Sequence, residues 1–280
     1  MEESTGTILT QSEESPRQDR PMQEAAPVAE PLPLDLPERI VSYSSGGKIY
    51  RHTFRRISPQ EWANDFFSKI VAQFKRVGDE GYEQTLYQED ACLALYARAA
   101  VSAEGFKLRE GDPPMNQWPS WPSCVPQNHR VTAVELLAQV VPSGEEQTPC
   151  PDGLAVAVDA LWGESDRAGE MRQFRGLIHR FAYPSREHSR RFFTEKARSL
   201  VVGGSRAGTT KLLSAHGTMV KLYDELIQGV EGYSFAGRPL ATREAVIREM
   251  DVVHKAVAVT QLFPATTVLD PRVKSQDAEE

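Results

Sequence analysis

The chain has few cysteines, no long apolar run and no leader-like start, and each shortage excludes a class of protein. Its three cysteines are odd in number and form no Cys-x-x-Cys pair, which argues against a disulfide framework or a zinc knuckle and is typical of free thiols in a reducing compartment. No apolar run approaches about 18 residues, the length that a membrane helix needs. The acidic start, Met1-Glu2-Glu3, lacks the apolar segment of a secretory signal, so we expect a cytoplasmic protein without a membrane partner.

The chain also lacks an excess of positive charge. Its formal net charge at pH 7 is −7, whereas binding to a nucleic-acid backbone needs clustered Lys and Arg. The composition therefore argues against a nucleic-acid partner. The hydrophobic fraction of 40% is ordinary for a globular protein, and the length allows two domains of about 100 residues, each with a small core of its own.

What the sequence does contain is an internal repeat. Residues 52–106 align without a gap with residues 179–233 at an offset of 127, and eleven of the fifty-five positions are identical. With a further shift of two residues, 128–134 align with 253–259. A repeat of this kind indicates one supersecondary unit that was copied, and the shared residues are expected to form its framework. The shared pairs of most interest are His52 with His179, Tyr96 with Tyr223, Gly105 with Gly232, and His129 with His254.

The repeat predicts an α+β fold made of two tandem modules, each a β-hairpin followed by three or four helices. We place module one at residues 38–142, a polar linker at 143–152, module two at 153–265 and a C-terminal tail at 266–280. Residues 1–37 are rich in Glu, Ser, Gln and Pro, a composition typical of a disordered or extended arm.

Periodicity and turn residues predict the individual elements. In module one, Ser58 is expected to cap a helix with Glu61 three residues later. The apolar stripe of that helix is predicted to be Trp62, Phe66, Ile70 and Phe74. The other elements predicted for module one are a hairpin at 39–43 and 48–55 and helices at 83–103 and 131–141. Those predicted for module two are a hairpin at 154–162 and 172–182 and helices at 185–201, 211–229, 243–250 and 253–263.

The paired histidines are the first candidates for chemistry. His52 and His179 alternate onto the apolar face of a strand, and His129 and His254 each open a helix. Histidine is a common metal ligand and general base, so a symmetric metal site or a histidine-dependent enzyme is one alternative. A metal site needs acidic or sulfur partners at matched positions, and only Glu104 with Glu231 recurs. The pattern favours buried, hydrogen-bonded structural histidines.

Two glycine patterns have simple structural interpretations. Gly105 and Gly232 lie in Glu-Gly-aromatic triplets, and each is predicted to end the second helix of its module as a left-handed cap. The segment 203–211 (GGSRAGTTK) resembles a phosphate-binding loop, but Lys211 comes two residues too late for that motif. Nucleotide binding there stays an alternative to a helix–helix loop, and we expect no cofactor and no catalytic residue.

Exposed apolar residues are the candidates for partner binding. The Pro-Leu stretch before Pro37 contains Leu32, Leu34 and Leu36 and could lie as an extended strand in the groove of a partner. Trp118 and Trp121 lie in a Pro-rich loop of module one, with Phe235 at the corresponding place in module two. Aromatic side chains on such loops are either interface anchors or caps of their own core.

The module pattern resembles a known family. The features that suggest it are a hairpin ending in His-x-Phe, a helix containing Leu222-Tyr223, a Glu-Gly-aromatic triplet and a short helix that begins with His-Lys or His-Arg. In this respect the chain is similar to the small cytoplasmic tail-assembly chaperones of long-tailed bacteriophages. The resemblance implies a non-enzymatic protein that binds the tape-measure protein and tail subunits. The chain departs from that family in being doubled and in carrying a long N-terminal arm, so a virion structural protein, such as a connector or tail component, is the second alternative.

Overall fold

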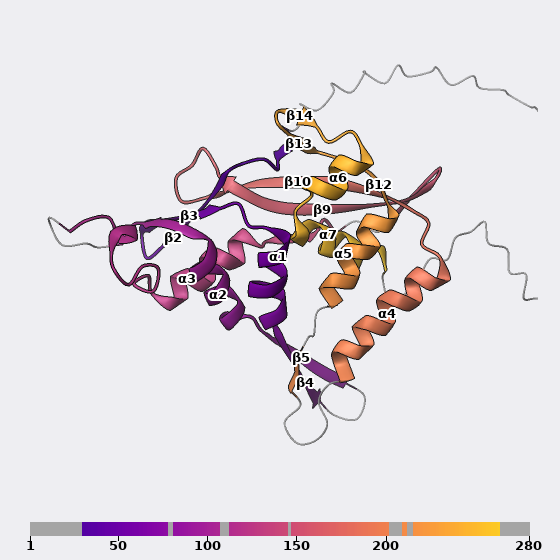
Figure 1. Cartoon of the computed structure of the whole chain (residues 1–280), viewed down its shortest axis with the longest axis horizontal. Coiled ribbons are helices and arrows are strands. Elements are labelled where there is room, and N and C mark those ends of the chain that lie inside the picture. Colours follow the sequence, from indigo (N-terminus) through magenta and orange to yellow (C-terminus); the bar gives the residue numbers. More distant parts are fainter. Residues whose placement is uncertain are drawn as a thin grey trace, which may run out of the picture. The chain divides into compact units, whose positions relative to one another are not determined.

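The alternation of apolar and polar residues after Pro37 produces the first hairpin. Strands β2 (Glu38–Ser45) and β3 (Lys48–Arg55) pair antiparallel across a turn at Gly46 and Gly47, both of which have positive φ, as a tight two-residue hairpin turn requires. Strand β6 (Ala100–Glu104) joins the other edge of β3. The computed structural model (Figure 1) describes residues 30–77, 81–106, 112–144, 147–201, 209–211 and 215–263, with the side chains of 71–77, 81–86, 196–201, 209–211 and 215 left aside.

The second sheet is larger and is built around a longer hairpin. Strands β9 (Gly153–Glu164) and β10 (Met171–Ala182) pair antiparallel, and β12 (Ile227–Glu231) joins β10. The outer edge of β9 pairs with β7 (Val140–Pro142) and β8 (Thr148–Cys150). The segment that follows the last helix of the first half therefore extends the sheet of the second half.

The two sheets share one pairing register at an offset of 127 residues. Arg51 lies opposite Glu104 on β3 and β6, and Ile178 lies opposite Glu231 on β10 and β12. Each ladder also has one irregularity at the same place, directly before Phe54 in the first and Phe181 in the second. A register is specific because a slip of one residue would turn every side chain to the opposite face.

Two pairs of helices lie at matching positions: α2 (Glu89–Ala99) with α5 (Ala215–Leu226), and α3 (Gln127–Leu137) with α7 (Val252–Leu262). The stretch that begins at Ser58 runs through α1 (Pro59–Glu61), the π-turn η1 (Trp62–Phe66) and the 3₁₀-turn η2 (Phe67–Lys69). The predicted Ser58–Glu61 capping box is confirmed. The remaining helical elements are η3 (Met115–Gln117), α4 (Arg186–Val201) and α6 (Arg243–Glu249).

Several predicted helices are wrong in extent. Residues 83–103 contain the end of β5 (Gly81–Tyr87), helix α2 and strand β6. Phe74 lies in β4 (Val71–Val77), which pairs with β5 and with β11 (Thr209–Lys211), so the helical stripe ends before it. In the second half, residues 227–231 likewise leave the helix for β12. The physical reason is that pairing with the open edges of β3 and β10 outweighs helix propensity, which differs between ordinary residues by less than about 1 kcal/mol each.

The Pro-Leu segment belongs to the ordered fold. Strand β1 (Leu32–Pro33) pairs in parallel with β13 (Tyr233–Phe235), which also pairs with β14 (Arg238–Pro239). The backbone N–H of Leu32 donates to Gly232 O at 2.8 Å. The fold therefore begins before the predicted boundary at residue 37, while residues 1–29 lie outside the described part of the chain.

Two hydrophobic clusters form the interior, one around each sheet. The first contains Phe54, Trp62 and Tyr96, and the second contains Phe181, Tyr223 and Leu32. The first residues of α7, Val252 and Val253, pack in the first cluster rather than the second. Both belong to one compact unit that begins at Pro31, and the overall class is mixed α+β.

The extra length of the second hairpin holds the two sheets together. Val41 pairs with His52, whereas the corresponding Val156 pairs with His179 across a hairpin that is twelve residues longer. The end of this hairpin lies against β2 (Figure 1): Gly169 N donates to Ser42 Oγ at 3.1 Å. A hydrogen-bonded ion pair joins Arg51 to Glu164 at 2.7 Å.

Candidate functional site

The paired histidines lie in two hydrogen-bonded chains of alternating Tyr and His side chains, one fully buried and one partly buried. In the second half, the Tyr223 hydroxyl lies 2.8 Å from His179 Nδ1, and His179 Nε2 lies 2.8 Å from the Tyr233 hydroxyl. That hydroxyl in turn lies 2.8 Å from His254 Nδ1. Each of the four side chains comes from a different element: His179 from β10, Tyr223 from α5, Tyr233 from β13 and His254 from α7. This hydrogen-bonded chain therefore links two strands and two helices of the second half.

The first half contains the same chain with a different bridging residue. The Tyr96 hydroxyl lies 2.8 Å from His52 Nδ1, at the same positions as Tyr223 and His179. The hydroxyl between the two imidazoles comes from Tyr43, which lies 3.4 Å from His52 Nε2 and 2.7 Å from His129 Nδ1.

The position that corresponds to Tyr233 in the first half is occupied by Phe106. Its ring packs 5.9 Å from His52 and 5.1 Å from His129, close to the 5.3 and 5.5 Å that separate Tyr233 from its two histidines. The bridging hydroxyl thus comes from β2 in the first half and from β13 in the second, and it lies between two imidazoles in both. This indicates that a donor and acceptor between the two rings is what the fold requires.

Burial keeps these histidines neutral. Desolvation lowers the pKa of His52 to about 4 and that of His179 to about 3, and it lowers the pKa of His254 well below its usual value. Desolvation also raises the pKa of the Tyr223 and Tyr233 hydroxyls well above the usual value. In His52 and His179 both ring nitrogens are hydrogen-bonded to tyrosines, so the one donor and the one acceptor of each neutral imidazole are occupied.

No metal centre takes shape around these residues. Within the described ranges, no three His, Cys, Asp or Glu side chains come together in a way that could hold a metal ion. The shared Glu104 and Glu231 lie at the ends of β6 and β12, where Glu231 pairs with Arg180, away from the imidazole nitrogens that hydrogen-bond to tyrosines.

A Ser–His–Glu arrangement, which the sequence reasoning missed, lies at the start of α4. Ser185 Oγ is 3.0 Å from His188 Nδ1, and His188 Nε2 is 3.6 Å from Glu225. The Ser185 backbone N–H also donates to His188 Nδ1 at 3.0 Å, and the His188 N–H donates to Ser185 Oγ at 3.3 Å. These are the bonds of a helix cap, so the serine is held as a cap rather than as an activated nucleophile.

The corresponding residues of the first half explain that arrangement. Ser58 caps its helix with Glu61, and Glu61 pairs with Arg98 at 3.4 Å. Positions 188 and 225 correspond to 61 and 98 at the offset of 127, and the signs of the two side chains are exchanged. A Ser-x-x-His motif at a helix start is the sequence signal that could have identified the second cap.

The candidate partner-binding residues differ in their surroundings. Leu32 and Leu34 are buried in the second core, and Leu36 packs against it, so the groove that they occupy belongs to their own chain rather than to a partner. This differs from the prediction. The main-chain pairing with β13 turns every second residue of the segment inward, and these residues are the three leucines. Trp118 and Trp121 are half-buried against the first core, and Trp118 Nε1 donates to Pro113 O at 2.9 Å.

The remaining candidates are distributed over both halves. Phe235 is half-buried at the edge of the second core, with the Arg56 guanidinium 5.9 Å from its ring. Gly105 and Gly232 have positive φ, as a left-handed turn requires, but they follow strands rather than helices. Of the segment 203–211, only β11 is described, and it pairs with β4; residues 203–208 lie outside the described residues.

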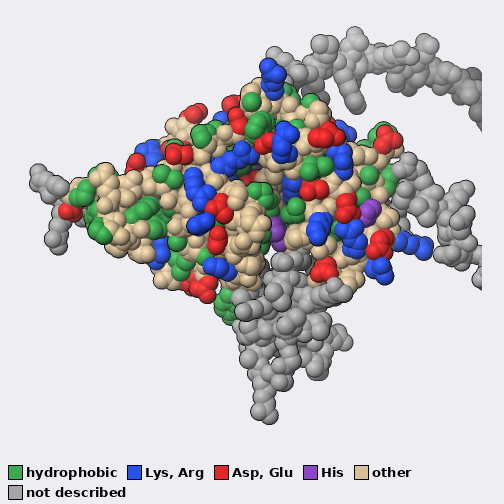
Figure 2. Space-filling model, viewed as in Figure 1, with side chains coloured by type: hydrophobic (Ala, Val, Ile, Leu, Met, Phe, Trp, Pro, Cys, Tyr) green, Lys and Arg blue, Asp and Glu red, His purple; other side chains and the backbone are tan. Residues whose placement is uncertain are grey.

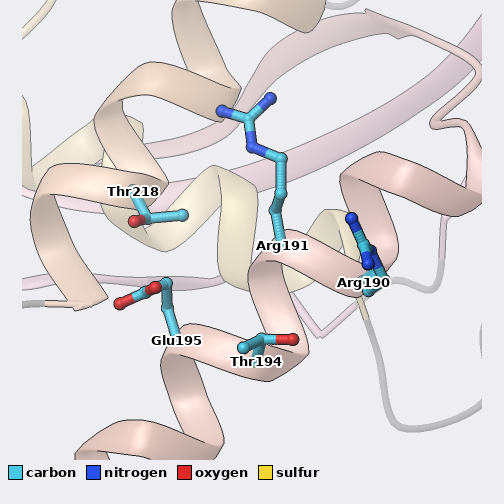
Figure 3. A pocket seen from close by; sticks show the side chains of 5 residues that line it. All are labelled: Arg190, Arg191, Thr194, Glu195 and Thr218. Carbon is cyan, nitrogen blue, oxygen red and sulfur yellow. The ribbon is translucent and has the colours of Figure 1, made fainter.

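A hollow of about 270 Å³ lies between α4 and α5, lined by Arg190, Arg191, Thr194, Glu195 and Thr218 (Figure 3). Its arginines are engaged: Arg190 pairs with Glu187 at 2.9 Å, and Arg191 pairs with Glu225 at 2.7 Å. Figure 2 likewise shows Lys and Arg interspersed with Asp and Glu over one face of the molecule. A single-sign patch that would attract a polyanion is not formed on this face.

Neither a protein-family model nor a curated protein nor a solved structure matches this chain. The resemblance to tail-assembly chaperones therefore stays a prediction. In the described part of the chain, no helix is both long and apolar enough to cross a membrane.

Proposed function

We propose that this chain is a non-enzymatic protein-interaction protein that acts in the assembly of a phage or phage-like tail. In this proposal it consists of two tandem copies of one hairpin-and-helix module. The resemblance of the module pattern to tail-assembly chaperones supplies the biological setting, and the tape-measure protein and tail subunits are the expected partners.

The observation that carries the non-enzymatic part is the hydrogen bonding of the paired histidines. His52 and His179 would be the natural acid–base residues of an enzyme built on the repeat, yet both are buried and bonded to tyrosines on both sides. A general base must lie within hydrogen-bond reach of the substrate proton that it takes, and these buried nitrogens reach tyrosine hydroxyls of their own core instead. Residues used in this way stabilise a core.

The tandem copies are supported by three independent agreements at one offset. They are the strand register with its irregularity before Phe54 and Phe181, the Tyr–His chains, and the capping serines Ser58 and Ser185 with their opposed partners. Unrelated folds have no reason to agree in all three. A module that spends its shared residues on its framework leaves its variable loops for partners.

The experiment is co-purification of the full chain with a tagged tape-measure protein and, separately, with a tail-tube subunit from the same genome. Formation of a stable complex with either protein is expected. Recovery of the chain in finished particles would indicate the alternative, a virion structural component. Failure to bind any particle protein would contradict the proposed function.

A further inference from the structure

A groove separates the end of the first hairpin from the bend between α6 and α7. Its volume is about 330 Å³, and Ile57, Pro59 and Trp62 line one wall while Met250 and Val252 line the other. Arg56 and Arg248 lie at its rim, and both donate to Glu249, at 3.0 and 2.6 Å. Five of the ten residues that line the groove are apolar, and concave sites that combine apolar walls with polar groups are where ligands usually bind.

A smaller cavity of about 40 Å³ adjoins the groove. The two share five lining residues, Arg56, Ile57, Trp62, Glu249 and Asp251, and the smaller one is also lined by Arg39, Trp162 and the arm residue Leu34. Its volume suffices for a single polar group, such as a carbonyl, whereas the groove beside it has room for a side chain. Leu34 of the arm therefore forms part of the wall of the small cavity. The site thus adjoins the surface on which the chain already binds its own extended Pro-Leu segment.

Three residues that line the small cavity carry buried nitrogens without a hydrogen-bond partner. These are Arg39 Nε, Trp62 Nε1 and Trp162 Nε1, and the three residues are 8%, 1% and 5% exposed. The other nitrogens of Arg39 are engaged, since Nη2 donates to Leu137 O at 2.8 Å and Nη1 lies 3.9 Å from Asp251. Buried donors in native proteins are normally paired, and here the three residues that carry unpaired donors line one cavity.

The charges nearby define what could pair with these donors. The charged side chains that line the site are already paired: Arg39 lies beside Asp251, Arg55 binds Glu61, and Arg56 and Arg248 both bind Glu249. The donors left unpaired are two uncharged indole N–H groups and the inner nitrogen of Arg39, and such a set suits a neutral acceptor. A peptide carbonyl is an acceptor without net charge, and the apolar walls suit the side chain that follows it. We propose that this site, between the hairpin end and the α6–α7 bend, binds an extended apolar segment of a partner protein through its backbone carbonyls.

This inference rests on the proposed function and names the kind of partner segment that the site binds. Its test uses a small probe and does not involve the partner. The probe is N-acetyl-leucine N-methylamide, a blocked residue with two carbonyls and one apolar side chain. A ligand of this size is expected to bind with a dissociation constant of about 1 mM. The readout is the ¹H–¹⁵N spectrum of the four tryptophan indoles in the full chain, assigned with single Trp→Phe variants.

We expect saturable downfield shifts of the Trp62 and Trp162 indole protons, because each gains an acceptor. The Trp118 indole, which already donates to Pro113 O, is the internal control and should not move. The exposed Pro59→Phe replacement at the groove should weaken binding at least tenfold, and the matched Thr218→Phe replacement in the hollow between α4 and α5 should leave it unchanged.

Three results would overturn the proposal. The first is the absence of a saturable shift at Trp62 and Trp162 at probe concentrations well above the expected dissociation constant. The second is equal movement of the Trp118 indole. The third is tighter binding of free N-acetyl-leucine, which would make the site an anion site. Co-purification with tail proteins can fail while the indoles respond, so the two proposals can be rejected separately.

Discussion

Moving the bridging hydroxyl of the first Tyr–His chain from one strand to another tests whether the two chains are equivalent. Tyr43→Phe removes the hydroxyl that lies 2.7 Å from His129 Nδ1 and 3.4 Å from His52 Nε2. The His129 bond is short but half-buried, and the His52 contact is long but fully buried. Leaving these nitrogens unpaired is expected to cost about 1–2 kcal/mol of the free energy of unfolding.

Phe106→Tyr should restore much of that loss, because residue 106 has the position from which Tyr233 bridges its histidines. Its ring already lies 5.1 Å from the His129 ring. In the wild-type background the same change adds a second hydroxyl to a space already served by Tyr43, and it should be neutral or slightly destabilising. The two changes together should therefore show a coupling free energy of about 1 kcal/mol in favour of the double variant.

Urea unfolding followed by circular dichroism measures these differences as shifts in midpoint at constant slope. Tyr50→Phe is the matched control, because the Tyr50 ring lies 4.2 Å from His129 while its hydroxyl makes no hydrogen bond that is seen in the described part of the chain. That variant should stay within about 0.5 kcal/mol of wild type. A double variant no more stable than the sum of its single changes would refute the equivalence of the two bridges.

Three further changes have definite expected outcomes. Gly169→Ala should lower the free energy of unfolding, measured in urea, by about 1 kcal/mol more than Gly163→Ala does. Both glycines have positive φ, but only at Gly169 would an added Cβ meet Ser44 Oγ, at 2.5 Å. Equal costs would contradict the docking of the long hairpin on β2. Leu32→Ala should lower the free energy of unfolding by about 3 kcal/mol, since Leu32 is fully buried, and an effect below about 1 kcal/mol would remove the arm from the core. Stability should fall as pH decreases from about 6.5 towards 3. The pKa of His179 is about 3 in the folded chain and about 6.5 in the unfolded chain. Below pH 6.5 the unfolded chain therefore binds a proton that the folded chain does not. For this group the free energy of unfolding changes by up to about 1.4 kcal/mol per pH unit. This dependence should be weaker in His179→Gln. An unchanged dependence in that variant would mean that His179 is not buried in its neutral form.

Much of the local structure follows from short-range patterns. The alternation around His52 and His179 predicted both hairpins, and the Ser58 cap was read correctly from its Pro and Glu neighbours. Helices α6 and α7 begin and end within one residue of their predicted limits. In each of these segments, local preference and final packing agree, and this is the condition under which periodicity predicts structure.

The errors occur where a neighbouring strand decided the outcome. Residues 100–104 and 227–231 leave their helices because β3 and β10 have open edges beside them. The leucines of the arm were expected to face a partner and lie instead in the second core, because β13 offers a pairing edge some 200 residues away in sequence. An unpaired edge is invisible to a pattern that extends over about fifteen residues.

The amino-acid sequence by itself determined the alternation of the hairpins, the helix caps and the recurrence of histidine, tyrosine and glycine at one offset, since these depend on residues close together or identical in type. Only the tertiary structure decided that Tyr43 does in the first half what Tyr233 does in the second, and that Arg39, Trp62 and Trp162 meet around one cavity. A hydroxyl or an unpaired N–H acts through its position in space, and several places along a chain can bring it to the same point.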